Sequence, residues 1–134
     1  MYKEIKVGVS VRPFKCTALT PVLYKSVFGL DWLKLCGQAA KEADRIEREK
    51  KEAEERGEVW TGDEVSSLAD HVPELAYIMN KQGEGVDPWK LSKEGFYEWL
   101  DELEPTDVLK AAPDILQLYN AQKRTTSTAK KNLK

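Results

Sequence analysis

The sequence predicts a mainly α-helical domain that begins with a short pair of β-strands. Apolar residues alternate with polar ones only near the start of the chain, and from residue 20 onward they recur at helical spacing. The chain has 134 residues, about one domain's worth of sequence. We therefore expect a compact helical domain over 1–121, interrupted by a charged extension at 41–58, and a flexible, disordered basic tail over 122–134.

The β element is predicted at the N-terminus. Residues 5–11 place an apolar side chain at every second position, which is the period of a strand with one buried face. Pro13 lacks the amide hydrogen that a strand donates to its neighbour, so we expect it to interrupt this strand. Residues 14–16 then form a short second strand.

The next segment predicts two helices. Thr20 followed by Pro21 is typical of an N-cap and a first helical residue. Gly29 predicts the end of the first helix, and Asp31 predicts the cap of the second, whose first residues are apolar. From residue 41 to 58 this second helix becomes charged, with six basic and eight acidic residues. We expect a solvated helical extension that frays toward Gly57.

The second half of the chain predicts three more helical segments. Helical spacing runs through about residues 63–81, where Pro73 should kink or split the helix. Ser92 predicts the cap of a helix with an apolar inner face, and the last helix starts near residues 104–107 and contains Pro113. After residue 120 no large apolar residue occurs before Leu133, so this tail cannot offset the entropy of ordering it.

The residues that could carry chemistry are few. His71 is the only histidine, and with Asp70 and Glu74 it forms a grouping that we interpret as a hydrogen-bonded histidine. The two cysteines, Cys16 and Cys36, are too few for a zinc site and lie among apolar residues. No nucleophile motif or phosphate-binding glycine loop occurs. We predict no enzyme, no catalytic residues, no metal and no cofactor.

Charge and hydropathy indicate where the protein works. No segment is apolar enough to span a membrane, and the N-terminus lacks the apolar stretch of a signal peptide, so we expect a soluble cytoplasmic protein. The net charge of −2 argues against a dedicated nucleic-acid binder. The charge is uneven, however: 82–107 holds eight acidic and two basic residues, and 121–134 holds five basic residues and no acid. This polarity favours head-to-tail or heterotypic contacts.

Of the four tryptophans, two are predicted to lie in the core and two at the surface. Trp32 and Trp99 lie on apolar helical stripes, which favours core packing, whereas Trp60 and Trp89 flank turns and are the better candidates for an exposed contact.

Three stretches taken in order resemble a known family. Residues 19–31, LTPVLYKSVFGLD, follow the strands; residues 75–81, LAYIMNK, precede a polar loop; residues 96–102, FYEWLDE, lead into a last helix that ends ILQLYN. This order resembles the tail assembly chaperones of long-tailed (siphovirus-like) phages and prophages of Gram-positive bacteria. Members commonly show T-P-x-x-Y-x-x-x-F-G-x-D, Y-x-M-x-K and E-W-L-D-E-like segments.

The resemblance implies a role in virion assembly. Such a chaperone binds the tape measure protein in multiple copies in the host cytoplasm, keeps it soluble, and leaves before the virion is mature. It also helps to recruit the major tail protein, in many phages through a longer form made by ribosomal frameshifting. Lys130-Lys131-Asn132 can be encoded by a slippery heptamer, which is compatible with such a form. Whether the chaperone forms a homo-oligomer stays open.

The partner-binding residues are our own prediction, since the family supplies no motif for them. An amphipathic client helix needs an apolar groove, and we assign the groove to residues of the first two helices: Leu23, Tyr24, Val27, Phe28 and Trp32. The alternative, that these five fill the core, stays open. Two other functions also stay open: a small cytosolic helical adaptor or regulator that binds one protein partner, and a nucleic-acid-associated protein that uses the basic tail.

Overall fold

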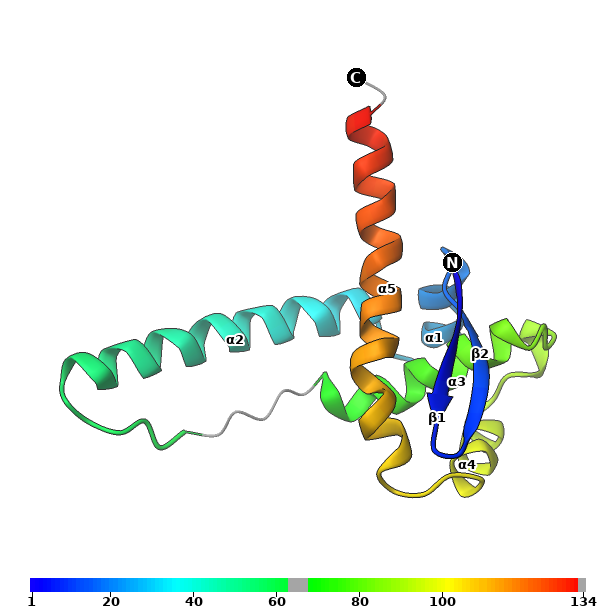
Figure 1. Cartoon of the computed structure of the whole chain (residues 1–134), viewed down its shortest axis with the longest axis horizontal. Coiled ribbons are helices and arrows are strands. Elements are labelled where there is room, and N and C mark those ends of the chain that lie inside the picture. The colour runs from blue at the N-terminus through cyan, green and yellow to red at the C-terminus, as the bar shows by residue number, and fades with distance from the viewer. Residues whose placement is uncertain (63–67, 133–134) are drawn as a thin grey trace.

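The computed structural model shows a small body of strands and helices, and the long helix Trp32–Glu55 leads away from it (Figure 1). The structure describes residues 1–62 and 68–132, and the side chains of these ranges up to Asn120. Within them the predicted mainly helical fold with an N-terminal strand pair is confirmed. The elements are β1 (Tyr2–Val7), β2 (Ser10–Lys15), α1 (Leu19–Phe28), α2 (Trp32–Glu55), the 3-10 helix η1 (Ala69–His71), α3 (Val72–Gly83), the 3-10 helix η2 (Pro88–Lys90), α4 (Lys93–Asp101) and α5 (Asp107–Asn132).

The two strands form an antiparallel hairpin, and this corrects the predicted strand over 5–11. β1 and β2 pair from Tyr2 opposite Lys15 to Val7 opposite Ser10, so the chain reverses at Gly8 and Val9. Gly8 has a φ of 68°, which glycine adopts without steric cost. Val9 fits the alternation of apolar and polar residues but does not belong to the buried face of the strand. Val7 is buried, whereas Val9 is fully exposed at the tip of the hairpin.

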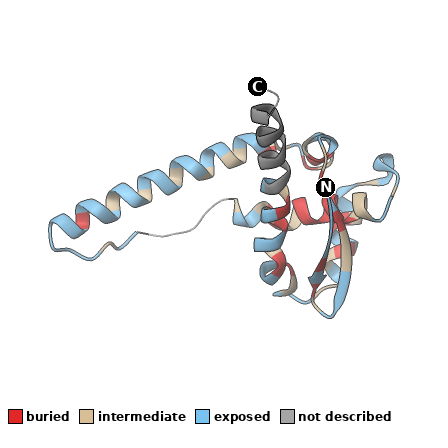
Figure 2. Cartoon of the chain, turned by 45° about the horizontal axis from the view of Figure 1, so that its top comes forward, coloured by how far each residue is buried: buried red, intermediate tan, exposed pale blue. Residues whose placement is uncertain are grey.

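Helix α3 is the centre of the body. Seven of its residues are buried: Val72, Leu75, Ala76, Tyr77, Ile78, Met79 and Asn80. It contacts β2, α1 and α5, and buried residues gather around it in Figure 2. At Gly83 the helix approaches the hairpin so closely that a Cβ atom would lie 2.5 Å from the carbonyl oxygen of Pro13. The central helix and the hairpin are therefore one packed unit.

The helix boundaries confirm some predicted caps and correct one. Asp31 caps α2 by accepting from the backbone N–H groups of Leu33 and Lys34, and Ser92 caps α4 by accepting from Gly95. The cap predicted at Thr20 is wrong, because α1 already begins at Leu19. The Thr20 side chain is instead fully buried and donates to Oε1 of Gln82 at 2.6 Å, which ties α1 to α3.

The two internal prolines have different consequences. Pro73 lies in the first turn of α3, directly after η1, so it marks a break in the predicted 63–81 segment. Residues 63–67 of that segment lie outside the described residues. Pro113 lies inside α5, which continues to Asn132. The flexible tail predicted for 122–134 falls on residues whose side chains are outside the described part of the chain.

Helix α2 forms an arm. Its 24 residues make it about 36 Å long, and beyond its first residues it leaves the body and stays exposed along most of its length (Figures 1 and 2). The arm ends at Glu55, and Gly57, with a φ of 72°, lets the chain turn back. The predicted charged helical extension is confirmed as this projecting helix.

Candidate partner-binding surface

Aromatic rings from α1, α3 and α4 meet in the core. The ring centroids of Tyr24 and Phe28 are 5.3 Å apart, and those of Phe28 and Phe96 are 5.2 Å apart. Tyr77 lies 5.7 Å from Phe96 and 5.8 Å from Trp99. These residues come from all three stretches that carry the family resemblance. The aromatic residues named here therefore join the three stretches within one packed core.

The predicted groove does not open to solvent. Tyr24 and Trp32 are completely buried, Leu23 and Phe28 are 7% exposed, and Val27 is half-buried against the same core. These five residues therefore pack in the core, which agrees with the alternative interpretation of the sequence. The five residues lie on α1 and at the start of α2, and in this structure α3, α4 and α5 cover them.

Asn80 is the one fully buried amide of α3 among the described residues. Its Nδ2 donates to the carbonyl oxygen of Pro13 at 2.8 Å, and its Oδ1 accepts from Nε1 of Trp99 at 2.9 Å. A buried polar group without a partner is costly, and here one side chain satisfies two others. Asn80 thus joins β2, α3 and α4.

His71 is hydrogen-bonded, as its sequence context predicted. Its Nδ1 lies 2.6 Å from Oε1 of Glu74, and the same oxygen accepts from the hydroxyl of Tyr24 at 2.8 Å. Among residues 1–62 and 68–120, no group of three or more potential ligands that could hold a metal ion is present. The trio links α1 to the first turn of α3.

Two tyrosines of the core predict how stability depends on pH. Burial raises the pKa of Tyr119 to about 12, with smaller contributions from Cys36, Cys16 and Asp31. Burial, and next Glu74, also raises the pKa of Tyr24 above its ordinary value. In the unfolded chain both hydroxyls ionise near pH ~10. Between that pH and the folded-state pKa the unfolded state binds fewer protons than the folded state, so stability falls as pH rises.

We therefore expect the free energy of unfolding to decrease as the pH rises above about pH 10. Urea unfolding followed by circular dichroism measures it, and Tyr119→Phe should remove part of the alkaline decrease. Tyr97→Phe, at an exposed site on α4, is the matched control and should leave the decrease in place. An identical alkaline decrease in Tyr119→Phe and in the unmodified chain would contradict this assignment.

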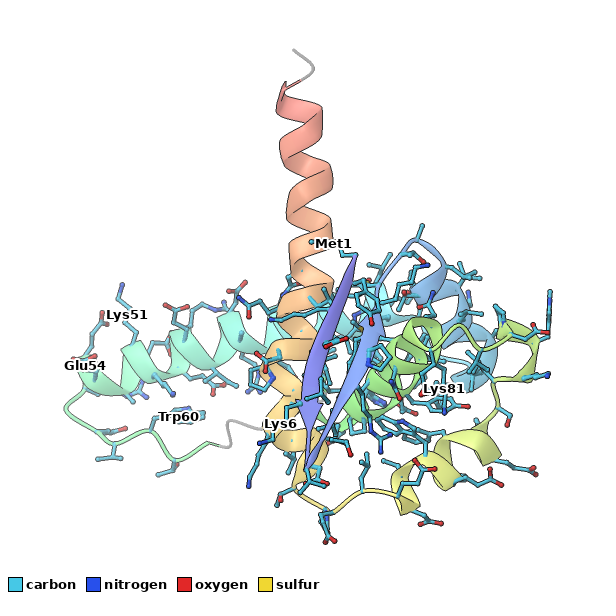
Figure 3. The ribbon with its side chains drawn as sticks, turned by 45° about the vertical axis from the view of Figure 1, so that its right-hand side comes forward. Met1, Lys6, Lys51, Glu54, Trp60 and Lys81 are labelled. Atoms are coloured by element: carbon cyan, nitrogen blue, oxygen red, sulfur yellow. The ribbon has the colours of Figure 1, made fainter. Side chains whose placement is uncertain are left out.

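The two tryptophans predicted to be exposed differ. Trp89, on η2, is 93% exposed, which confirms the prediction. Trp60 is half-buried at the tip of the arm, where its Nε1 lies 3.2 Å from Oε2 of Glu49 and the Nζ of Lys50 lies 5.0 Å from the ring centroid. In Figure 3, Trp60 lies beneath the end of α2, and Lys51 and Glu54 lie on the far side of that helix. Trp60 therefore fastens the returning chain to the arm.

Further apolar side chains are exposed on several elements. Leu33 and Leu109 are more than half exposed, as are Val22 and Tyr97. A cleft of about 170 Å³ opens beside η2, with Tyr77 and Trp99 among its lining residues and Lys90 and Glu98 also contributing to it. The exposed apolar residues could not be predicted from the sequence, because helical stripes identify the buried face and the exposed apolar positions follow no period.

None of the helices in the described ranges combines the length and the apolar composition needed to cross a bilayer. In comparisons with protein-family models, curated proteins and solved structures, the chain has no significant match.

Proposed function

We propose that this protein is a tail assembly chaperone of a long-tailed phage or prophage. In this proposal it binds the tape measure protein in several copies, keeps it soluble in the host cytoplasm, and helps to recruit the major tail protein. The observation that carries the proposal is the order and spacing of the three motifs at 19–31, 75–81 and 96–102.

The packing of the motifs supports treating them as one set. Phe96 of the third motif packs against Phe28 of the first and against Tyr77 of the second. Residues that contact one another in the folded chain must be compatible in size and shape. The joint presence of the three motifs therefore supports the family resemblance more strongly than any one motif alone.

The surface also suits a non-enzymatic partner role. Trp89 is a large aromatic side chain left in solvent, and tryptophan is enriched among residues that dominate binding energy. The arm is covered with charges of both signs and would keep a client coated by several copies hydrated. In this proposal the client contacts the exposed apolar residues of the body, and the charged part of α2, residues 41–55, faces solvent.

A helical adaptor for one globular partner is the second candidate. The cleft beside η2 favours it, because a pocket of about 170 Å³ has room for one inserted side chain rather than for a long helix. The two candidates differ in stoichiometry: an adaptor binds one partner once, whereas a chaperone binds one client several times.

Co-expression tests the proposal. The full chain is expressed with a helical segment of a phage tape measure protein that is insoluble alone, and the soluble fraction of that segment is measured. We expect the segment to become soluble and to co-purify with this chain. If the soluble fraction is the same with and without this chain, the chaperone assignment is wrong.

Trp89→Ala tests the proposed client contact. Because Trp89 is 93% exposed, the substitution should change the stability by less than ~0.5 kcal/mol. Loss of a central tryptophan contact costs about 2 kcal/mol or more, so the affinity for the client should fall by at least about 30-fold. Val59→Ala, at the exposed tip of the arm, is the control and should bind normally. Equal affinity of both variants would show that Trp89 is not in the contact.

A further inference from the structure

The cleft beside η2 is lined by aromatic rings. It has a volume of about 170 Å³, and Tyr77 of α3 and Trp99 of α4 line it together with Leu91 and Gly95. A cavity of about 150 Å³ holds one benzene-sized ring, so this cleft has room for an aromatic side chain. The connection from α3 to α4, which carries η2, lies on the side of the body away from the arm (Figure 1). The arm therefore leaves this side open to another molecule.

One polar group in the cleft lacks a partner. Tyr77 is only 2% exposed, and its hydroxyl lies so close to Gly95 that a Cβ atom on Gly95 would be 2.5 Å from the hydroxyl oxygen. Within the residues that the structure describes, this hydroxyl makes no hydrogen bond to another protein group. Buried polar groups are generally hydrogen-bonded, and a tyrosine hydroxyl can both donate and accept. The cleft thus offers a hydrogen bond to a group that enters it.

Two charged residues of the cleft are also without a partner. Of the four charged residues that line it, Lys81 and Glu102 each belong to an ion pair within the chain. Lys90 of η2 and Glu98 of α4 have no ion-pair partner among the residues whose side chains are described. These two residues are exposed, have opposite charges and come from different walls of the cleft.

Trp89 is next to the cleft in sequence but does not fill it. It directly precedes Lys90 and Leu91, which both line the cleft, yet its own side chain is 93% exposed. Its indole N–H is a donor only, and it has no acceptor in the described part of the chain. One surface therefore holds an exposed aromatic side chain and, beside it, a cleft that an aromatic side chain fits.

We infer that this surface pairs with the same surface of a second copy of the chain, with Trp89 of each copy in the cleft of the other. The contact has two-fold symmetry, so every interaction occurs twice and assembly stops at the dimer. The indole packs against Tyr77 and Trp99, and its N–H donates to the Tyr77 hydroxyl. The two-fold relation also lets Lys90 of each copy pair with Glu98 of the other.

The dimer needs no client and stands independently of the proposed function. A contact built on two small clefts belongs to the low end of interface sizes, so the dimer should be weak and reversible. Because the proposed function places Trp89 in the client contact, a client and a second copy would compete for this side chain.

Sedimentation velocity over a range of protein concentrations tests the contact with the full chain and no client. We expect monomer at low concentration and dimer at high concentration. Trp89→Ala removes both inserted side chains and should raise the dissociation constant at least about 30-fold. Tyr97→Ala is the matched control, because Tyr97 is an exposed aromatic residue of α4 that does not line the cleft. This control should dimerise like the unmodified chain.

An exchange of charges tests the two-fold arrangement. Lys90→Glu places like charges opposite each other at both ends of the contact, so it should weaken the dimer. Adding Glu98→Lys in the same chain restores opposite charges and should restore the dimer. Adding Glu47→Lys on the arm to Lys90→Glu instead restores the net charge without the pair, and this control should stay weak. Circular dichroism shows whether each variant is folded.

Several results would overturn the inference. They are a monomeric unmodified chain at all concentrations, assembly that continues beyond the dimer, and a Trp89→Ala variant that dimerises as tightly as Tyr97→Ala. A charge-exchanged chain that dimerises no better than the arm control would contradict the two-fold pairing of Lys90 with Glu98. None of these results bears on whether the chain solubilises a tape measure segment.

Discussion

Phe96→Ala is expected to lower the free energy of unfolding by about 3–5 kcal/mol. The Phe96 ring lies between α1, α3 and α4, with centroids 5.2 Å from Phe28 and 5.7 Å from Tyr77. Because its neighbours come from three helices, they cannot collapse together into the space that the ring leaves. Urea unfolding followed by tryptophan fluorescence measures the loss.

The adjacent Tyr97 provides the control on the same helix. It is 60% exposed, so Tyr97→Ala should change the stability by no more than ~0.5 kcal/mol. Equal losses for the two alanine variants would mean that α4 is not packed through Phe96, and the described core would be wrong at this point.

Asn80→Ala is expected to cost about 3 kcal/mol, because it removes a side chain that satisfies two buried groups at once. The carbonyl of Pro13 and the indole N–H of Trp99 both lose their partner, and each unsatisfied buried group costs roughly 1–3 kcal/mol. Thermal and urea unfolding both measure this loss.

A double-mutant cycle separates the hydrogen bond from packing. Trp99→Phe keeps an aromatic ring and removes the N–H, so it should cost less in the Asn80→Ala background than in the unmodified chain. A coupling energy near zero would show that the bond between Trp99 and Asn80 contributes nothing to stability.

The helices could be predicted because their signals are local. Asp31 and Ser92 each cap the helix that follows them, and a residue three positions away is within reach of a short side chain whatever the rest of the chain does. The hairpin turn was missed because Gly8 and Val9 fit the alternation of the strand, and Thr20 was misassigned because its partner, Gln82, is 62 residues away.

The surface was harder to predict than the core. Leu23, Tyr24 and Phe28 form an apolar stripe, but a stripe does not reveal whether a helix of the same chain or of another one covers it. Trp60 and Trp89 both flank turns, and only the long-range fold-back of the chain onto Glu49 and Lys50 distinguishes the half-buried one from the exposed one. Long-range contacts of this kind leave no local pattern.

The number of copies bound to clients of different length decides between a tail assembly chaperone and an adaptor. Three tape measure segments are used, the second twice and the third three times as long as the first. Each is saturated with this chain, and the mass of each complex is measured by light scattering coupled to size-exclusion chromatography. A tail assembly chaperone predicts several copies per client, in a number that increases in proportion to client length. A single copy on every segment, whatever its length, would contradict the proposal and favour the adaptor.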